Sequence, residues 1–254
     1  MNYLINSILI PIGNFFFRWR DTAFTVIFAS AFYFVTFPEL AFGDSNFELI
    51  ITILGFAVVM LGQFIRAITI GYAYIVRGGL NKKIHADKLV ISGMFNHSRN
   101  PLYVGNILMV FGAIMVINIS WYYIIMTPLF YLIYISITLA EEKFLRNKFG
   151  ADYDEYIKKV NRFWPHRFSQ WSKSIEGMDF TWKRLLKKEH NTTFFVFTSL
   201  IVFTAVKYHF RYSLDWMSSE IMILWALIAV LIVFQIIVVI LKKTSRLEWD
   251  PNRP

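Results

Sequence analysis

The chain contains no cysteine among its 254 residues, so disulfide bonds, thiolate metal sites and cysteine nucleophiles are excluded. Its five histidines show no spacing that is typical of a metal site. A phosphate-binding P-loop, a dinucleotide-binding glycine motif and a serine nucleophile elbow are also missing. These absences argue against nucleotide-phosphate binding through a P-loop and against hydrolysis through a serine or cysteine nucleophile.

Only 17% of the residues are charged, whereas 56% are hydrophobic and 19% are aromatic. This balance is typical of a polytopic membrane protein and not of a soluble domain. A helix that crosses about 30 Å of hydrocarbon needs a long apolar stretch. The chain offers six, over Thr22–Phe42, Phe47–Ile70, Leu102–Ile117, Trp121–Ala140, Thr192–Tyr208 and Glu220–Leu241. We therefore predict an all-α fold, a polytopic helical membrane protein with about six transmembrane helices.

The N-terminal run of the chain is apolar but contains Pro11 and Gly13, which are expected to interrupt a helix. No basic residue precedes this run, since Arg18 and Arg20 follow it, so it does not resemble a secretory signal. We expect an interfacial or re-entrant segment here.

The positive charge is unevenly distributed along the chain. The formal net charge of +9 could by itself indicate a nucleic-acid partner. With the N-terminus in the cytoplasm, however, 23 of the 26 lysines and arginines fall on cytoplasmic segments, and the outer loops hold only Lys207 and Arg211. Such an asymmetry is the usual sign of membrane orientation. The sequence therefore predicts an integral membrane protein with cytoplasmic N- and C-termini and no nucleic-acid partner.

One stretch, Lys88–Gly105, combines helix-start signals with the beginning of an apolar span. Asn100 is a favourable N-cap residue, and Pro101 suits the first helical position, where its missing N–H is not needed. We expect a helix to begin here and to enter the bilayer. The free N–H groups of such a helix start can bind an anion, although the dipeptide alone is more commonly just a cap.

A second polar stretch, residues 141–165, begins with Glu141 and Glu142. If the two apolar spans between the stretches form a helical hairpin, both stretches lie on the same, cytoplasmic face of the membrane. Gly150 suits the position just after a helix, and Asp152 can cap a short helix that ends near Val160. The hairpin would bring a helix start and two carboxylates close together.

Together the two stretches resemble the isoprenylcysteine carboxyl methyltransferases and the related phospholipid N-methyltransferases. The family pattern LVxxGxYxxxRHPxYxG is matched by Leu89, Val90, Gly93, Phe95 (for Tyr), Arg99, Asn100 (for His), Pro101, Tyr103 and Gly105. The pattern EExxLxxxFGxxYxxYxxxVxRFxP is matched by Glu141, Glu142, Leu145, Phe149, Gly150, Tyr153, Tyr156, Val160, Arg162, Phe163 and Pro165. The resemblance covers about residues 55–166.

The resemblance implies an integral membrane methyltransferase that uses S-adenosylmethionine, with its site at the cytoplasmic face and a lipophilic acceptor from the bilayer. We predict catalytic roles for Arg99 and Glu141. The cofactor contacts that the resemblance implies are Leu89, Val90, Phe95, Asn100, Pro101, Leu102, Tyr103 and Glu141.

Two departures from the family pattern bear on the chemistry. Asn100 keeps a hydrogen-bonding side chain but lacks the titratable ring of the histidine. Eukaryotic carboxyl methyltransferases also place an arginine for the substrate carboxylate one turn before the glutamates, where this chain has Ile137, Thr138 and Leu139. A prenylcysteine carboxylate is therefore not supported as the acceptor.

Several motif residues also have a purely structural interpretation. Arg99 could bind a lipid phosphate at the interface. Glu142 lies four residues before Arg146, which favours a helix-supporting ion pair. Tyr153 and Tyr156 are expected to pack rather than to bind a ligand.

Gln63 and Arg66, one turn apart in the second span, are functional candidates because polar groups within a membrane are costly. The alternative is that Arg66 extends to the inner interface while Gln63 bonds a neighbouring helix. His85 could contact the cofactor, but a loop histidine is usually solvated.

We divide the chain into an N-terminal segment with the first transmembrane helix (1–54), a methyltransferase core (55–166), an interfacial linker (167–191) and a C-terminal transmembrane pair with a tail (192–254). Candidate acceptors are an isoprenoid carboxylate, a phospholipid amine and a lipophilic thiol. An NADPH-dependent sterol-type membrane reductase and a non-enzymatic lipid-binding or transport protein are the alternatives. The scarcity of ionisable groups expected within the spans argues against the last of these.

Overall fold

The computed structural model describes residues 5–35, 45–73 and 84–248. Within these residues it contains helices and no strand. Short helical turns lie at Ile5–Leu9, Gly93–Asn96, Tyr122–Met126 and Phe168–Gln170. The α-helices are α2 (Ile10–Phe34), α3 (Ser45–Tyr72), α4 (Pro101–Ile117), α5 (Thr127–Phe149), α6 (Ala151–Lys159), α7 (Trp171–Ser174), α8 (Trp182–Tyr212) and α9 (Ser219–Lys243).

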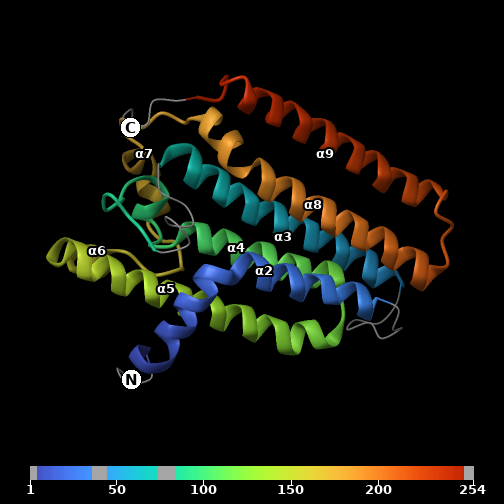
Figure 1. Cartoon of the computed structure of the whole chain (residues 1–254), viewed down its shortest axis with the longest axis horizontal. Helices are drawn as coiled ribbons and strands as arrows, with labels where there is room; N and C mark the ends of the chain where they lie inside the picture. Colours follow the sequence, from blue (N-terminus) through green and yellow to red (C-terminus); the bar gives the residue numbers. More distant parts are fainter. Residues whose placement is uncertain (1–4, 36–44, 74–83, 249–254) are drawn as a thin grey trace.

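The long helices lie side by side in one bundle (Figure 1). α3 packs most extensively on α4, α2 packs on α5, and α8 lies between α3 and the outermost helix, α9. α4 and α5 form the predicted hairpin. The short helices α6 and α7 lie at the end of the bundle where α4 begins and α5 ends, so both motif stretches are found at that end.

Four described helices are long and apolar enough to cross a membrane: α3, α5 with its preceding turn, α8 and α9. α4, with 17 residues, is a shorter apolar helix, as expected for the third span. α2 is not among the four; it contains Arg18, Arg20 and Asp21, and the end of the expected span Thr22–Phe42 lies outside the described residues. The predicted polytopic helical membrane protein is confirmed, while a crossing by the first expected span stays a prediction.

The expected helix interruption at Pro11 and Gly13 is wrong, because α2 runs through both residues. Pro11 is the second residue of α2 and directly follows the helical turn Ile5–Leu9, so the chain is helical on both sides of it. Gly13 lies where α2 meets α5, and a Cβ on it would come within 2.0 Å of the Ser136 carbonyl oxygen. This glycine therefore permits a close helix contact and does not break the helix.

Four glycines hold α3 and α4 in direct backbone contact. A Cβ on Gly62 would lie 2.5 Å from the Gly105 carbonyl oxygen, and a Cβ on Gly112 would lie 2.5 Å from the Gly55 carbonyl oxygen. Small residues at such crossings allow membrane helices to approach closely. The two pairs fix the register of the antiparallel helices, and Gly105 thereby ties the first motif stretch to α3.

The membrane helices contain more ionisable groups than the sequence suggested. Lys207, expected in an outer loop, lies within α8 and is fully buried, with its ammonium 3.1 Å from the Glu48 carboxylate of α3. It also donates to the Val116 carbonyl oxygen of α4 at 2.7 Å. The expected scarcity of ionisable groups within the spans is therefore wrong. α8 itself begins at Trp182, so residues 182–191 of the expected linker are helical and continuous with the fifth span.

Candidate active site

The two motif stretches are joined by hydrogen bonds at the end of the bundle where α4 begins. The N–H of Arg99 donates to the Asn161 carbonyl oxygen (2.9 Å), and the N–H of His166 donates to the His97 carbonyl oxygen (3.1 Å). The Ser98 hydroxyl donates to a carbonyl oxygen of the same strip, that of residue 163, at 3.1 Å. We name this contact between residues 97–100 and 157–166 the clasp. It confirms that the hairpin brings the helix start and the second stretch together.

Glu142 is the charged centre of the clasp. Its carboxylate accepts two hydrogen bonds from the Arg162 guanidinium (2.9 and 2.8 Å) and lies 3.0 Å from an Arg99 nitrogen. The hydrogen bonds to Glu142 raise the pKa of Arg162. The expected pair between Glu142 and Arg146 is wrong, because Arg146 instead bonds Asp154 at 2.7 Å. Arg99 is thus held by a carboxylate of the second stretch.

α4 begins at Pro101, as the Asn100-Pro101 dipeptide predicts. The Asn100 carbonyl oxygen accepts hydrogen bonds from the N–H groups of Tyr103 and Val104, both at 3.0 Å. The Asn100 side chain makes no capping hydrogen bond and donates instead to the Arg162 carbonyl oxygen at 3.1 Å. Asn100 therefore belongs both to the clasp and to the helix start.

Glu141 contacts a different set of residues from its neighbour Glu142. The Tyr103 hydroxyl of α4 donates to the Glu141 carboxylate at 2.7 Å. The Arg20 guanidinium of α2 donates to the same hydroxyl at 3.4 Å, and its positive charge acts on both Tyr103 and Glu141. Three helices therefore meet at Glu141, and Arg20 supplies a cation beside it.

The remaining residues predicted to contact the cofactor lie around the clasp. Leu89 packs against the tyrosine cluster of α6. The Phe95 carbonyl oxygen accepts a hydrogen bond from the Tyr156 hydroxyl at 2.6 Å. Val90 and Leu102 are half-buried. The structure therefore gathers these residues at the same end of the bundle as Glu141, and their contact with a cofactor stays a prediction.

The tyrosines and histidines of this region have mainly structural contacts. Tyr153 and Tyr156 are buried and pack together, as expected, and this burial raises the pKa of both hydroxyls. His85 is bonded to the exposed Asp87 at 2.9 Å. His97 is fully buried, and its Nδ1 lies 2.8 Å from the His166 carbonyl oxygen. His97 is thus a structural part of the clasp, a role that the sequence does not reveal.

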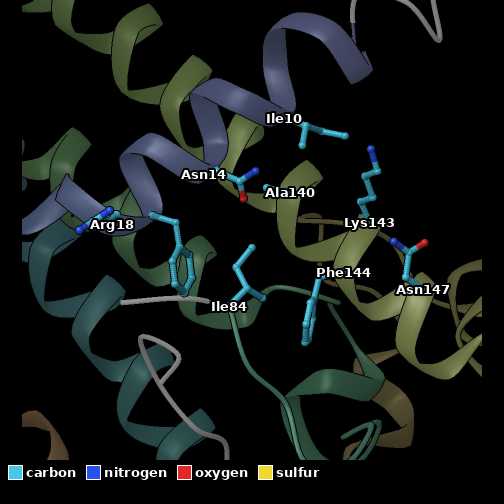
Figure 2. Close-up of a pocket in the computed structure, with 9 residues that line it drawn as sticks. Ile10, Asn14, Arg18, Ile84, Ala140, Lys143, Phe144 and Asn147 are labelled. Atoms are coloured by element: carbon cyan, nitrogen blue, oxygen red, sulfur yellow. The ribbon is translucent and has the colours of Figure 1, made fainter. Parts of the chain in front are cut away.

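A pocket of about 460 Å³ lies between α2 and α5 (Figure 2). Sites for small molecules have volumes of this order. The pocket is amphiphilic, and four of its nine lining residues come from α2. Its apolar lining residues are Ile10, Phe17, Ile84, Ala140 and Phe144, and its polar or basic ones are Asn14, Arg18, Lys143 and Asn147. Ala140 and Lys143 are close to Glu141 along α5, but Glu141 itself is not a lining residue.

A further polar group lies within the bundle, around Arg66 of α3. The Arg66 guanidinium forms a bidentate pair with Glu189 of α8 (2.9 and 2.8 Å) and also donates to Asn106 of α4. Gln63 donates to the same carboxylate (3.2 Å) and to Thr193 (2.9 Å). Gln63 therefore bonds a neighbouring helix, as expected. The alternative that Arg66 extends to the interface is wrong, because its side chain is buried in this ion pair.

Arg20, Glu189 and the pocket are not apparent from the sequence. Arg20 is 83 positions from Tyr103, and Glu189 is 123 positions from Arg66, so no local spacing links the partners. The usable signal is the charge itself, because a charged side chain in an apolar helix needs a partner. That signal points to the residue but not to the partner.

Two comparisons with known proteins bear on the chain. Residues 50–152 match the family described as phospholipid methyltransferase. The chain is also 30% identical, over 138 residues, to the protein-S-isoprenylcysteine O-methyltransferase of Saccharomyces cerevisiae, a match that covers 49% of this chain and 53% of that protein. The chain thus spans about half the length of this relative. No solved structure matches the chain.

The matched residues contain most of α3 and the whole of α4 and α5, which carry Arg66, Tyr103 and Glu141. They also include the whole first motif stretch and the start of the second. Two separate comparisons thus point to the family that the motif stretches predict. The predicted resemblance is therefore confirmed: residues 50–152 match the phospholipid methyltransferase family, and the chain is similar to an isoprenylcysteine methyltransferase.

Proposed function

We propose that this protein is an S-adenosylmethionine-dependent membrane methyltransferase that acts on a lipophilic acceptor. The observation that carries the proposal is the position of Glu141. It lies where the two family stretches meet, accepts a hydrogen bond from Tyr103 and follows Ala140, which lines an amphiphilic pocket. A carboxylate held in this way can orient a cationic ligand next to an apolar one.

The residues around Glu141 fit the chemical groups of S-adenosylmethionine. The Glu141 carboxylate suits the ammonium or the ribose hydroxyls, and the N-terminus of α4 suits the carboxylate. When bound, the cofactor supplies an electrophilic methyl group that is displaced in line. We propose that the cofactor side of the site consists of Leu89, Val90, Phe95, Asn100, Pro101, Leu102, Tyr103 and Glu141.

In methyl transfer the protein mainly has to position the methyl donor and the acceptor and to exclude water. We assign Glu141 to orienting the ligand, with the Tyr103 hydroxyl holding the carboxylate. Arg99, predicted as catalytic, has its guanidinium bound to Glu142, so we assign it to fixing the clasp. In that role Arg99 keeps Asn100 and the start of α4 in place beside Glu141.

The pocket between α2 and α5 is proposed to receive the acceptor, which would arrive laterally from the bilayer. Its apolar lining suits an alkyl or isoprenoid chain, since each buried methylene contributes about 0.8 kcal/mol. Arg18 and Lys143 suit a polar or anionic head group. The head group is a carboxylate, an amine or a thiol. The distribution of basic residues supports a site at the cytoplasmic face, with both termini on that side.

The proposal is tested with the full chain in nanodiscs and S-adenosylmethionine labelled in its methyl group. Three acceptor probes cover the candidate head groups: a long-chain isoprenoid carboxylic acid, phosphatidylethanolamine and a long-chain alkyl thiol. Label should appear in at least one probe, and a short water-soluble analogue of that probe should react more slowly. A failure to label any of the three, or NADPH-dependent reduction of a sterol instead, would contradict the proposal.

A matched pair of variants tests the role of Glu141. Glu141→Gln removes the charge, so cofactor binding should weaken by about 1.5–3 kcal/mol, the contribution of a hydrogen bond to a charged group. Glu155→Gln removes an exposed carboxylate of α6 that pairs with Lys159, and cofactor binding should not change. Calorimetry that finds the same cofactor affinity in both variants would remove Glu141 from the site.

A further inference from the structure

The ion pair between Arg66 and Glu189 is one end of a polar connection that leads to Glu141. The two residues are 5% and 2% exposed, and two hydrogen bonds of 2.9 and 2.8 Å join them. The Arg66 Nη1 atom donates to Asn106. The planar guanidinium thus binds the Glu189 carboxylate and the Asn106 side-chain amide at the same time and fixes both.

From Asn106 the connection continues across α4 and α5. The Asn106 side chain interacts with the Tyr134 hydroxyl of α5. The Tyr134 ring packs on the Tyr103 ring, with 5.6 Å between the ring centroids. The Tyr103 hydroxyl then donates to Glu141 at 2.7 Å. The orientation of the residue that holds Glu141 therefore depends, through consecutive contacts, on α3 and α8.

Stability alone gives a weak reason for burying these charges. Taking each ion out of water costs several kcal/mol, and an apolar pair of similar volume is often as stable as a buried ion pair or more stable. Ionisable residues within membrane helices are also rare unless they serve a function. Two apolar side chains would join α3 to α8 without this cost. An ion pair that ends in a hydrogen bond to Asn106 does what apolar residues cannot, because it orients a polar group.

We propose that Arg66 and Glu189 are positioning residues of the methyl-transfer site. They hold Asn106, and through it the two tyrosines, so that Glu141 meets its ligand in one orientation. This inference rests on the proposed function. Glu189 belongs to α8, beyond the residues 50–152 that match the family. On this proposal α8 contributes to the site.

The test uses a variant in which both charges are replaced by apolar residues, Arg66→Met with Glu189→Leu. Either single change would leave the other charged residue buried without its partner and would destabilise the fold. The double change removes both charges and avoids this. The thermal midpoint and the cofactor dissociation constant should stay at the wild-type values. The kcat per cofactor-binding site, measured with the probe that the wild type methylates, should fall about 100-fold, the effect of misplacing a reacting group by about 1 Å.

The matched control is the double variant His190→Leu with Gln235→Leu. The His190 Nδ1 atom lies 3.1 Å from the Gln235 Oε1 atom, so this partly buried polar pair joins α8 to α9, one residue along from Glu189. The kcat of the control should equal that of the wild type.

The outcomes of this test are distinct. A wild-type kcat in the Arg66–Glu189 double variant would overturn the positioning role alone, since the wild type would still methylate the probe. Loss of folding or of cofactor binding in that variant would also overturn it, by showing that the pair is structural. Equal losses of kcat in both double variants would show that activity depends on polar side chains of α8 in general and not on the Arg66–Glu189 pair in particular. A wild type that methylates none of the probes would refute both the proposed function and this inference.

Discussion

Glu142 is predicted to be a stability residue, in contrast to Glu141, and the change Glu142→Gln separates the two. Its carboxylate joins both motif stretches, because it binds Arg99 at 3.0 Å and Arg162 at 2.9 and 2.8 Å. The carboxylate is 14% exposed, so solvent screens these contacts only in part. Glutamine keeps the shape and one acceptor oxygen but removes the charge that holds two guanidinium groups.

The magnitude follows from these contacts. Hydrogen bonds to a charged group contribute about 1.5–3 kcal/mol, and the remaining amide oxygen of glutamine recovers part of that. We expect a loss of about 2 kcal/mol in the free energy of unfolding. For a chain of this size each kcal/mol moves the thermal midpoint by about 2–4 °C, so the midpoint should fall by about 4–8 °C.

The assay is thermal unfolding of the purified protein in one detergent, with Asp154→Asn as the matched control. Asp154 also binds an arginine, Arg146, at 2.7 Å, but the two side chains are 48% and 55% exposed. An exposed pair contributes about 0–1 kcal/mol, so the midpoint of this variant should hardly change. The reasoning is refuted if Glu142→Gln and Asp154→Asn lower the midpoint equally.

Three further predictions follow from the structure. Tyr103→Phe keeps the ring contact with Tyr134 but removes the hydrogen bond to Glu141, so kcat/KM in steady-state methylation should fall by an amount equivalent to about 1.5–3 kcal/mol. The control Tyr156→Phe loses only a hydrogen bond to the Phe95 carbonyl oxygen and should retain activity. Gly105→Ala would place a Cβ 2.6 Å from Arg66 Cγ and 2.7 Å from the Gly62 carbonyl oxygen. The cost of overpacking, about 1–3 kcal/mol, should outweigh the gain in helix propensity and lower the thermal midpoint. An unchanged midpoint would contradict the close contact between α3 and α4. Because the chain has no cysteine, Ser213→Cys and Ser172→Cys each provide one reactive thiol; a membrane-impermeant reagent should label the first and not the second in intact cells, and the reverse pattern would place the site outside.

Much of the candidate site was predictable because its signals are local. The start of α4 follows from Pro101, which suits the first helical position, whereas the Asn100 side chain does not make the expected cap. The end of α5 follows from Gly150, which has a φ of 52° that other residues adopt at a cost. The apolar spans follow from composition alone. In each case the cause lies within a few residues of the effect.

The partners of the charged side chains were not predictable, because they are set by helix packing. Helical spacing favours Arg146 as the partner of Glu142, yet the clasp brings Arg99 and Arg162 closer. Arg66 was expected to be a functional candidate or to extend to the inner interface, and neither expectation identified Glu189 of α8 as its partner. Local preferences therefore located the site but did not determine the network of charges within it.

The separation of Arg66 and Glu189 in the chain has a consequence for biosynthesis. α3 leaves the ribosome long before α8, since 123 positions separate the two partners. During that interval the arginine of α3 has to be accommodated without this carboxylate, and an unpaired charge in a bilayer is costly. Insertion of α8 supplies the counter-charge and completes the bundle. A nascent chain that ends before α8 would therefore present the Arg66 charge without its Glu189 partner. Membrane quality control could distinguish such a chain from the finished protein by this charge.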